Sequence, residues 1–291
     1  MLEVNEITST QNSKIKGVVA LLEKSKLRRS NGLFVVEGVR ELSHCLKAGY
    51  SVKDIYFLPD ILSFSQVEKI LSSQKNRCNS SGSKKESLGG KKEPQIYSVS
   101  KDVYAKMAYR EGTEGVIAVI EVKNLSLKDI VFKSAEANAN PFILIVEKVE
   151  KPGNLGALLR TADACGVDAV IVCDPLTDLY NPNLIRSSLG GIFTQQVVAC
   201  SNQEAYKWLK ENNIAIFTAQ LQDSEWYYNR DLIQPCAIVM GNEANGLTDF
   251  WREVSNAKVK IPMLGELDSL NVSVSAAVLC YEVVRQRECA K

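Results

Sequence analysis

Three segments in the second half of the chain combine polar side chains with glycines, a pattern typical of loops that hold a ligand. The first is KPGNLGALLR (151–160), in which Asn154 stands between two glycines and Arg160 ends the segment. Asn154 is suited to cap a helix that begins there. Arg160 lies among apolar and small residues, so its guanidinium needs either a structural carboxylate or a ligand phosphate.

The second and third segments follow later apolar runs. GNEANG (241–246) has a glycine at each end, which allows close approach of a backbone to a ligand. Glu243 between these glycines could equally start the next helix. In IPMLGELDSLNVSVSAA (261–277), Ser269, Asn271 and Ser273 lead into an apolar helix. An N-cap role explains one of these three polar residues easily, and it explains all three less well.

The elements that position these loops alternate between buried strands and helices. Apolar runs of four to six residues indicate strands buried on both faces, as in parallel sheets. The predicted strands are 142–147, 169–174, 214–220, 236–241 and 257–263, and the predicted helices are 154–166, 203–213 and 272–287. The pattern predicts an open α/β sheet, in which ligands bind at the carboxyl ends of the strands. The last helix is apolar nearly all round, which indicates a deep core helix or, as we favour, a dimer interface.

The first half predicts a smaller α/β domain. A basic amphipathic helix is expected over 11–29, and strands at 33–38 and 52–59 flank a helix at 39–49. This strand–helix–strand order predicts parallel pairing. The polar, Lys-rich stretch 72–95 indicates a flexible insertion. We expect domains at 1–123 and 141–291, joined by a linker at 124–140.

Composition excludes several classes of protein. The 291 residues are 45% apolar and 24% charged, which is typical of a globular chain and unlike collagen or a wholly disordered protein. No apolar run reaches the roughly 18 residues that a membrane span needs, and no secretory signal is evident, so a cytoplasmic protein is expected. Eight scattered cysteines without a CxxC pair, and a single histidine, argue against zinc fingers and a disulfide framework. No metal is expected.

The net charge of +1 hides an asymmetry between the two halves. The first 140 residues carry 22 Lys and Arg against 16 Asp and Glu, whereas the remainder carries 13 against 18. A basic first half favours contact with a polyanion such as nucleic acid, although solvated surface charge explains the same count.

The three segments together resemble the motifs of the SpoU family, the SPOUT-class RNA ribose 2′-O-methyltransferases. The resemblance rests on N-x-G-x-x-x-R, G-N-E-x-x-G and IPM…SLNVSVSAA, found in this order between 142 and 287. The segment LFVVEGVRELSHCLKAGYSVKDIYF (33–57) resembles the family's substrate-binding extension, a small α/β domain similar to certain ribosomal proteins. The resemblance implies a SPOUT domain with a deep trefoil knot, S-adenosylmethionine as cofactor, and homodimers in which both chains build each site. The cofactor would be held mostly by backbone groups around Ala219, Gln220, Gly241, Ile261 and Leu270.

The resemblance also implies catalytic residues. The family's first motif places its proposed base at Arg160. Because arginine keeps its proton up to a pKa above about 12, Arg160 could instead clamp the phosphate next to the target and align the ribose hydroxyl. The other active-site positions match Asn154, Glu243, Ser269 and Asn271, which would orient Arg160, the loops and the target ribose.

The RNA would be contacted by the first half. Sequence-independent phosphate contacts are expected from five basic residues, Lys14, Lys16, Lys24, Arg28 and Arg29. A solvated basic helix is the alternative for each of them. We favour ribosomal RNA over transfer RNA, since a domain that resembles ribosomal proteins suits structured RNA recognised by shape and 2′-hydroxyls.

Two other functions stay open on the sequence. A non-catalytic RNA-binding protein could retain the fold, but a degenerate site would be expected to lose Arg160 or Glu243 first. A nicotinamide or flavin enzyme could use Asp174, after the strand AVIVC, to bind a ribose. The missing GxGxxG turn counts against that second alternative.

Overall fold

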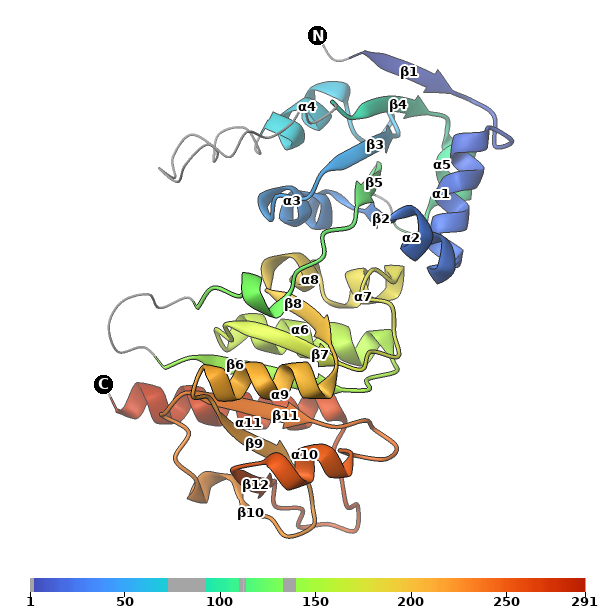
Figure 1. The fold of residues 1–291 in the computed structure, drawn as a ribbon. Coiled ribbons are helices and arrows are strands. Elements are labelled where there is room, and N and C mark those ends of the chain that lie inside the picture. Colours follow the sequence, from blue (N-terminus) through green and yellow to red (C-terminus); the bar gives the residue numbers. More distant parts are fainter. Residues whose placement is uncertain (1–2, 73–92, 110–111, 113, 133–139, 291) are drawn as a thin grey trace. The chain divides into compact units, whose positions relative to one another are not determined.

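The computed structural model describes residues 3–72, 93–109, 112, 114–132 and 140–290, which form two compact units (Figure 1). The first unit comprises Met1–Lys123 together with Tyr180–Thr194, and the second comprises Asn124–Leu179 and Gln195–Lys291. Most of the insertion expected at 72–95 lies outside the described residues.

The first unit is built on a mixed five-stranded sheet with the order β1-β4-β3-β5-β2. Its strands are β1 (Val4–Ile7), β2 (Leu33–Glu37), β3 (Val52–Phe57), β4 (Gln95–Val99) and β5 (Val116–Glu121). The prediction of parallel pairing is only partly right. β2 and β3 run in the same direction, but β5 lies between them and is antiparallel to both. The strand–helix–strand unit leaves room for one strand, which a later segment of the chain fills.

The helices of the N-terminal region are α1 (Ser13–Glu23), α2 (Ser25–Asn31), α3 (Val39–Lys47), α4 (Phe64–Ser72) and α5 (Lys101–Met107). The single basic helix predicted over 11–29 is wrong, because Lys24 is extended and separates α1 from α2. Arg28 lies on α2, where only 3% of it is exposed, and its guanidinium donates to the carbonyl oxygens of Leu21 and Leu22 at the end of α1. The break is thereby stabilised, since helix ends leave carbonyl groups without intrahelical partners.

A segment from the second half of the sequence completes the first unit. It carries α7 (Pro182–Ser187) and α8 (Gly191–Thr194), drawn in yellow in Figure 1. The ring of Phe34 on β2 stacks on Tyr180, with centroids 4.3 Å apart, and on Phe193 at 6.0 Å. Such aromatic pairs bury large apolar areas. This segment therefore belongs to the core of the first unit.

The second unit contains a seven-stranded sheet with the order β10-β12-β9-β11-β6-β7-β8, in which every neighbouring pair is parallel. The strands are β6 (Phe142–Glu147), β7 (Ala169–Cys173), β8 (Val197–Cys200), β9 (Ala215–Ala219), β10 (Glu225–Trp226), β11 (Cys236–Met240) and β12 (Ala257–Lys260). The predicted α/β class with an open parallel sheet is confirmed. The threading of a trefoil knot stays a prediction.

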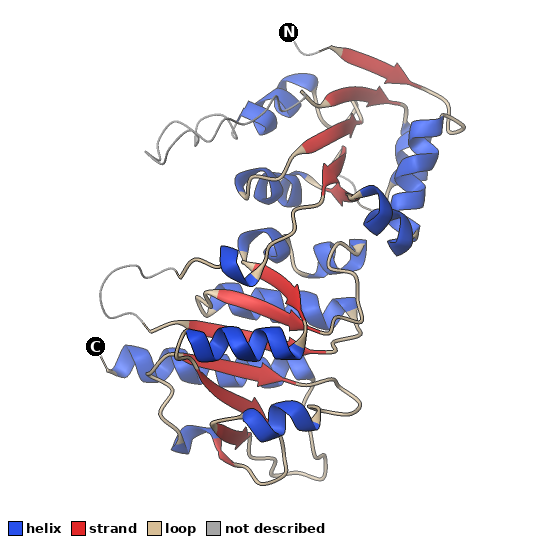
Figure 2. Ribbon diagram, in the orientation of Figure 1, coloured by secondary structure: helices blue, strands red, loops and turns tan. Residues whose placement is uncertain are grey.

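Helices cover both faces of this sheet (Figure 2). They are α6 (Pro152–Ala164), α9 (Asn202–Glu211), α10 (Asp249–Val254) and α11 (Val272–Cys289), and short 3-10 turns occur at Leu127–Asp129 and Tyr227–Asn229. α9 and α10 contact each other, as do α6 and α11. Every residue of β6 and β7 is buried, as expected for strands covered on both faces.

Within the ranges given above, no helix has the length and hydropathy of a membrane-spanning segment.

The last helix, α11, is not buried on all sides in the single chain. Leu279 and Val283 are buried against the sheet, whereas Val274 and Tyr281 are 48% and 53% exposed. The homodimer through this helix stays a prediction.

The seven cysteines in the described part of the chain are free. Burial raises the pKa of Cys165 and of Cys236 to about 11, so both thiols are protonated at neutral pH. A buried, protonated thiol is a poor nucleophile. Cys78 lies outside the described residues.

Arg287, near the end of α11, ties the start of β6 to the loop before β11. Its guanidinium donates to the carbonyl oxygens of Asn140 at 2.7 Å, Gln234 at 3.0 Å and Pro141 at 3.2 Å.

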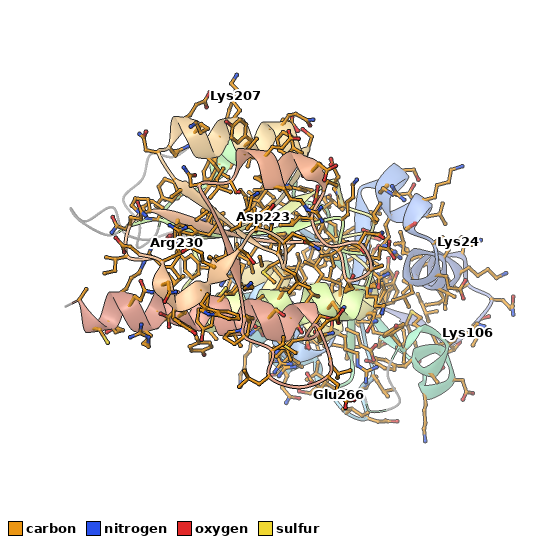
Figure 3. The ribbon with its side chains drawn as sticks, turned by 90° about the horizontal axis from the view of Figure 1, so that it is seen from below. Lys24, Lys106, Lys207, Asp223, Arg230 and Glu266 are labelled. Atoms are coloured by element: carbon orange, nitrogen blue, oxygen red, sulfur yellow. The ribbon has the colours of Figure 1, made fainter. Side chains whose placement is uncertain are left out.

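Arg287→Ala removes these bonds and is expected to lower the free energy of unfolding by about 2–4 kcal/mol, measured by urea denaturation. Lys207→Ala is the control, because this exposed side chain on α9 (Figure 3) has one weak pair worth less than about 0.5 kcal/mol. Equal losses for the two variants would contradict the structural role of Arg287.

Candidate active site

A cavity of about 600 Å³ lies in the second unit, where β9, β11 and β12 end. Its wall is made mainly by residues 219–222 at the end of β9, 240–247 at the end of β11, 259–261 and 263 at the end of β12, and 268–272 before α11. This is the edge of a parallel sheet at which ligands generally bind. Its volume is within the about 300–1,000 Å³ usual for small-molecule sites.

The loop after β11 is folded tightly on itself. Asn242 and Gly246 exchange two backbone hydrogen bonds, of 3.1 and 2.9 Å. A Cβ atom on Gly241 would lie 2.3 Å from the carbonyl carbon of Gly246 and 2.4 Å from the nitrogen of Leu247, so only glycine fits. Gly241 is therefore required by close approach of two backbone segments.

The side chain of Asn242 fastens this loop to the segment after β6. Its Nδ2 donates to the carbonyl oxygen of Lys148 at 2.8 Å, and its Oδ1 accepts from the backbone of Ala244 at 2.8 Å. Asn242 is not among the site residues predicted from the sequence. Its place between Gly241 and Glu243 was the available signal, since asparagine often hydrogen-bonds to the backbone of its own turn.

Three side chains that are distant in the sequence meet at the cavity wall. Asn154 donates from Nδ2 to the Glu243 carboxylate and accepts, through Oδ1, from Nδ2 of Asn271 at 3.4 Å. Asn271 is also the N-cap of α11, with its Oδ1 accepting from the backbone of Ser273 at 3.0 Å. We call Asn154, Glu243 and Asn271 the polar triad. It joins one residue from each of the three segments singled out in the sequence.

The structural alternatives for two members of the polar triad are wrong. α6 begins at Pro152 with Lys151 as its N-cap, so Asn154 lies inside the first turn and caps nothing. Glu243 lies in a turn six residues before α10, which begins at Asp249, and does not start that helix. Their hydrogen bond to each other is the interaction that accounts for both side chains.

The cavity brings together nine of the ten predicted catalytic and cofactor residues, Asn154, Ala219, Gln220, Gly241, Glu243, Ile261, Ser269, Leu270 and Asn271. Ser269 donates to Asp268 at 3.1 Å. Oε1 of Gln220 is buried and has no protein partner among the described residues. A buried acceptor without a partner at a cavity wall is available to a ligand donor.

Arg160 is the exception. It lies on α6 with its side chain exposed, and it is not part of the wall of its own chain's cavity. The sequence left open a structural carboxylate or a ligand phosphate as the partner of its guanidinium. Among the described residues, this side chain has no carboxylate partner and no other hydrogen-bond partner.

The five basic residues predicted to contact RNA differ in their surroundings. Lys16, Lys24 and Arg29 are exposed on α1 and at α2, and Lys24 extends outward in Figure 3. Lys14 pairs with Asp54 at 3.3 Å. Arg28 is buried in its helix-end contacts, so a phosphate contact does not fit this position and that prediction is corrected.

Comparison with known proteins assigns both parts of the chain. Residues 141–281 match the SpoU rRNA methylase family, and residues 12–118 match the MRM3-like substrate binding domain. The chain is 35% identical over 206 residues to the 23S rRNA (guanosine-2′-O-)-methyltransferase RlmB of Haemophilus ducreyi, covering 66% of this chain and 79% of that protein. The chain belongs to the SpoU rRNA methylase family. The matched residues 141–281 include the whole polar triad and Arg160.

Solved SpoU-type structures match over nearly the full length. The crystal structure of an RNA 2′-O ribose methyltransferase is 34% identical, with a TM-score of 0.75, and the match covers 98% of this chain and all of that one. The SpoU methyltransferase AviRb from Streptomyces viridochromogenes, solved in complex with the cofactor AdoMet, is 26% identical with a TM-score of 0.80 over 96% and 99% of the two chains. RlmP of Bacillus subtilis, named a 23S rRNA (guanosine(2553)-2′-O)-methyltransferase, is also similar, with 27% identity over 96% of this chain and 99% of its own.

Proposed function

We propose that this protein transfers a methyl group from S-adenosylmethionine to a ribose 2′-hydroxyl of ribosomal RNA. The observation that carries this proposal is the polar triad, because it unites the three family motifs at one cavity. Ribosomal RNA is favoured over transfer RNA, since RlmB and RlmP are both named 23S rRNA methyltransferases. A cytoplasmic location stays a prediction.

The cavity wall suits S-adenosylmethionine. When bound, this cofactor supplies an electrophilic methyl group on a sulfonium centre. Backbone groups of Ala219, Gly241 and Ile261 would hold it, and apolar contact would come from Leu270. The unpartnered Oε1 of Gln220 is an acceptor for an amino or hydroxyl group of a nucleoside.

The remaining residues prepare the acceptor. Glu243, held by Asn154, and Ser269 orient the ribose at the cavity, while Asn271 fixes the start of α11. Arg160 either takes the hydroxyl proton or clamps the neighbouring phosphate. Because Arg160 does not line its own chain's cavity, we propose a homodimer in which the partner's copy of this arginine completes each site.

Thermal-shift titration tests the cofactor class. S-adenosylhomocysteine, the product of methyl transfer, is expected to raise the melting temperature in a concentration-dependent way, because a ligand that binds only the folded state stabilises it. NAD is expected to have no effect. Stabilisation by NAD and none by S-adenosylhomocysteine would overturn the proposal and favour the nicotinamide enzyme with Asp174 as the ribose-binding acid.

The exposed basic residues of the first unit are expected to bind RNA phosphates. The variant Lys16→Ala, Lys24→Ala, Arg29→Ala should weaken RNA binding for all sequences and reduce the slope of log affinity against log salt by about three, one for each lost contact. Filter binding at several salt concentrations measures both effects. Lys207→Ala with Lys210→Ala on α9 is the control, and an equal change in slope there would contradict the placement of the contacts on α1 and α2.

A further inference from the structure

Glu147, the last residue of β6, is a carboxylate buried completely in the second unit. Its Oε1 accepts hydrogen bonds from Asn202 Nδ2 and from Thr248 Oγ1, both at 2.6 Å, and its Oε2 accepts from the backbone nitrogen of Thr248 at 2.8 Å. No cation pairs with it in the described part of the chain. Buried polar groups need hydrogen-bond partners, and these three donors supply them to both carboxyl oxygens.

Two of the three donors belong to Thr248, the last residue of the loop 241–248 that follows β11 and lines the cavity. Near the start of this loop, Asn242 Nδ2 donates to the carbonyl oxygen of Lys148 at 2.8 Å and to Glu150 Oε1 at 3.3 Å. Between these points Glu243 accepts from Asn154. The segment from Glu147 to Asn154 therefore holds the loop 241–248 near its start, through Asn242 and Glu243, and at its end, through Thr248.

The third donor is fixed in its orientation. Oδ1 of Asn202 accepts from Nε1 of Trp251 at 2.8 Å, and Trp251 is fully buried. Because the amide oxygen is engaged there, the Nδ2 group must face Glu147. Glu147 thus meets a fixed N–H on each side, from Asn202 and from the backbone of Thr248, and both of its oxygens must accept.

We infer that Glu147 is the positioning residue of the cofactor cavity: its carboxylate fixes the loop 241–248 in the conformation that receives S-adenosylmethionine. Glu147 itself does not line the cavity and acts through Thr248. The inference rests on the proposed function for the identity of the ligand, whereas the ordering of the loop by Glu147 does not depend on it.

Glu147→Gln tests this inference with almost no change of shape. In either orientation the glutamine amide nitrogen faces an N–H group, of Thr248 or of Asn202, so one contact becomes donor against donor. We expect the affinity for S-adenosylhomocysteine, measured by isothermal titration calorimetry, to fall by about tenfold or more. We also expect faster amide hydrogen exchange of residues 242–248 in the protein without ligand. Thr248→Val, which removes only the hydroxyl donor, should shift both readouts in the same direction and serves if Glu147→Gln does not fold.

Asp168→Asn is the matched control, because Asp168 is a buried carboxylate beside the opposite end of β6, where it accepts from the backbone nitrogen of Phe142 at 2.8 Å. It should lower the melting temperature and leave both the affinity and the exchange of the loop unchanged.

A second substitution, Asn202→Asp, turns the donor that faces the introduced glutamine amide into an acceptor. Adding it to Glu147→Gln should restore affinity and exchange, which a general loss of stability would not explain.

Several results would overturn the inference. Wild-type affinity and wild-type loop exchange in Glu147→Gln would show that the loop is ordered without the carboxylate. An equal loss of affinity in Asp168→Asn would show an effect of stability alone. If the unaltered protein does not bind S-adenosylhomocysteine, the proposed function fails, and the exchange of residues 242–248 still decides whether Glu147 orders the loop.

Discussion

Replacing Arg160 with alanine is expected to lower kcat for RNA methylation by at least about 100-fold, while the affinity for S-adenosylhomocysteine changes by less than about twofold. The affinity is expected to change little because Arg160 is exposed on α6 and does not line its own chain's cavity. Single-turnover methylation and calorimetry measure the two effects. A variant with full turnover would remove Arg160 from the mechanism, and a large loss of cofactor affinity would assign it to cofactor binding.

Arg160→Lys separates the two roles left open for this side chain. Lysine retains a positive charge but cannot form the two-pronged contact of a guanidinium with a phosphate. If Arg160 clamps a phosphate and aligns the hydroxyl, the lysine variant should stay well below the wild type at neutral pH. If Arg160 serves as the base, the lysine variant should gain activity as the pH rises toward the ordinary lysine pKa of about 10.4.

Gly241→Ala is expected to weaken S-adenosylhomocysteine binding by at least about 100-fold. The added Cβ atom would lie 2.3 Å from the backbone of Gly246, a contact that no flexible side chain can relieve, so the loop 241–248 must change its shape. Calorimetry measures the affinity. Circular dichroism is expected to show a folded protein, because the change is confined to one loop at the end of the sheet.

Gly17→Ala is the matched control for this substitution. Gly17 lies in α1, where an added Cβ atom has nothing within 4 Å, and alanine favours a helix over glycine by about 1 kcal/mol. Its affinity for S-adenosylhomocysteine should equal that of the unaltered protein. Undiminished binding by Gly241→Ala would contradict the assignment of the cofactor to this cavity.

Mixing the Arg160→Ala and Gly241→Ala variants tests whether each active site combines residues of two chains. Arg160→Ala retains an intact cavity, and Gly241→Ala retains an intact arginine. If each site combines the cavity of one chain with the arginine of its partner, hybrids formed by unfolding and refolding the two together should recover methylation. Continued inactivity of well-formed hybrids would contradict a site shared between two chains.

The periodic parts of the second unit were predictable because physical patterns specify them. The uninterrupted apolar run of β6 indicates a strand covered on both faces, and the polar residues after such strands meet at one edge of the sheet. The convergence of Asn154, Glu243 and Asn271 follows from this rule together with the family motifs. Their pairing does not follow, since it depends on the exact path of three loops.

Other features depend on contacts that no local pattern records. The place of β5 between β2 and β3 is a choice of topology, and the stacking of Tyr180 on Phe34 joins residues far apart in the chain. Arg28 looks like a surface cation in the sequence, yet the break at Lys24 supplies the carbonyl groups that bury it. Glu147 ends an apolar run and gives no sign of its donors, because they come from α9 and from the residue before α10.

The central claim is methyl transfer to RNA, and the most direct test is incorporation from labelled S-adenosylmethionine into separated ribosomal and transfer RNA that lack modifications. Nucleoside analysis then identifies the methylated atom. We predict a 2′-O-methylated nucleoside in the ribosomal RNA pool and no incorporation with Arg160→Ala. Methylation of a base would contradict this claim. So would a protein that binds S-adenosylhomocysteine but methylates no form of ribosomal RNA, whether intact, naked or partly assembled.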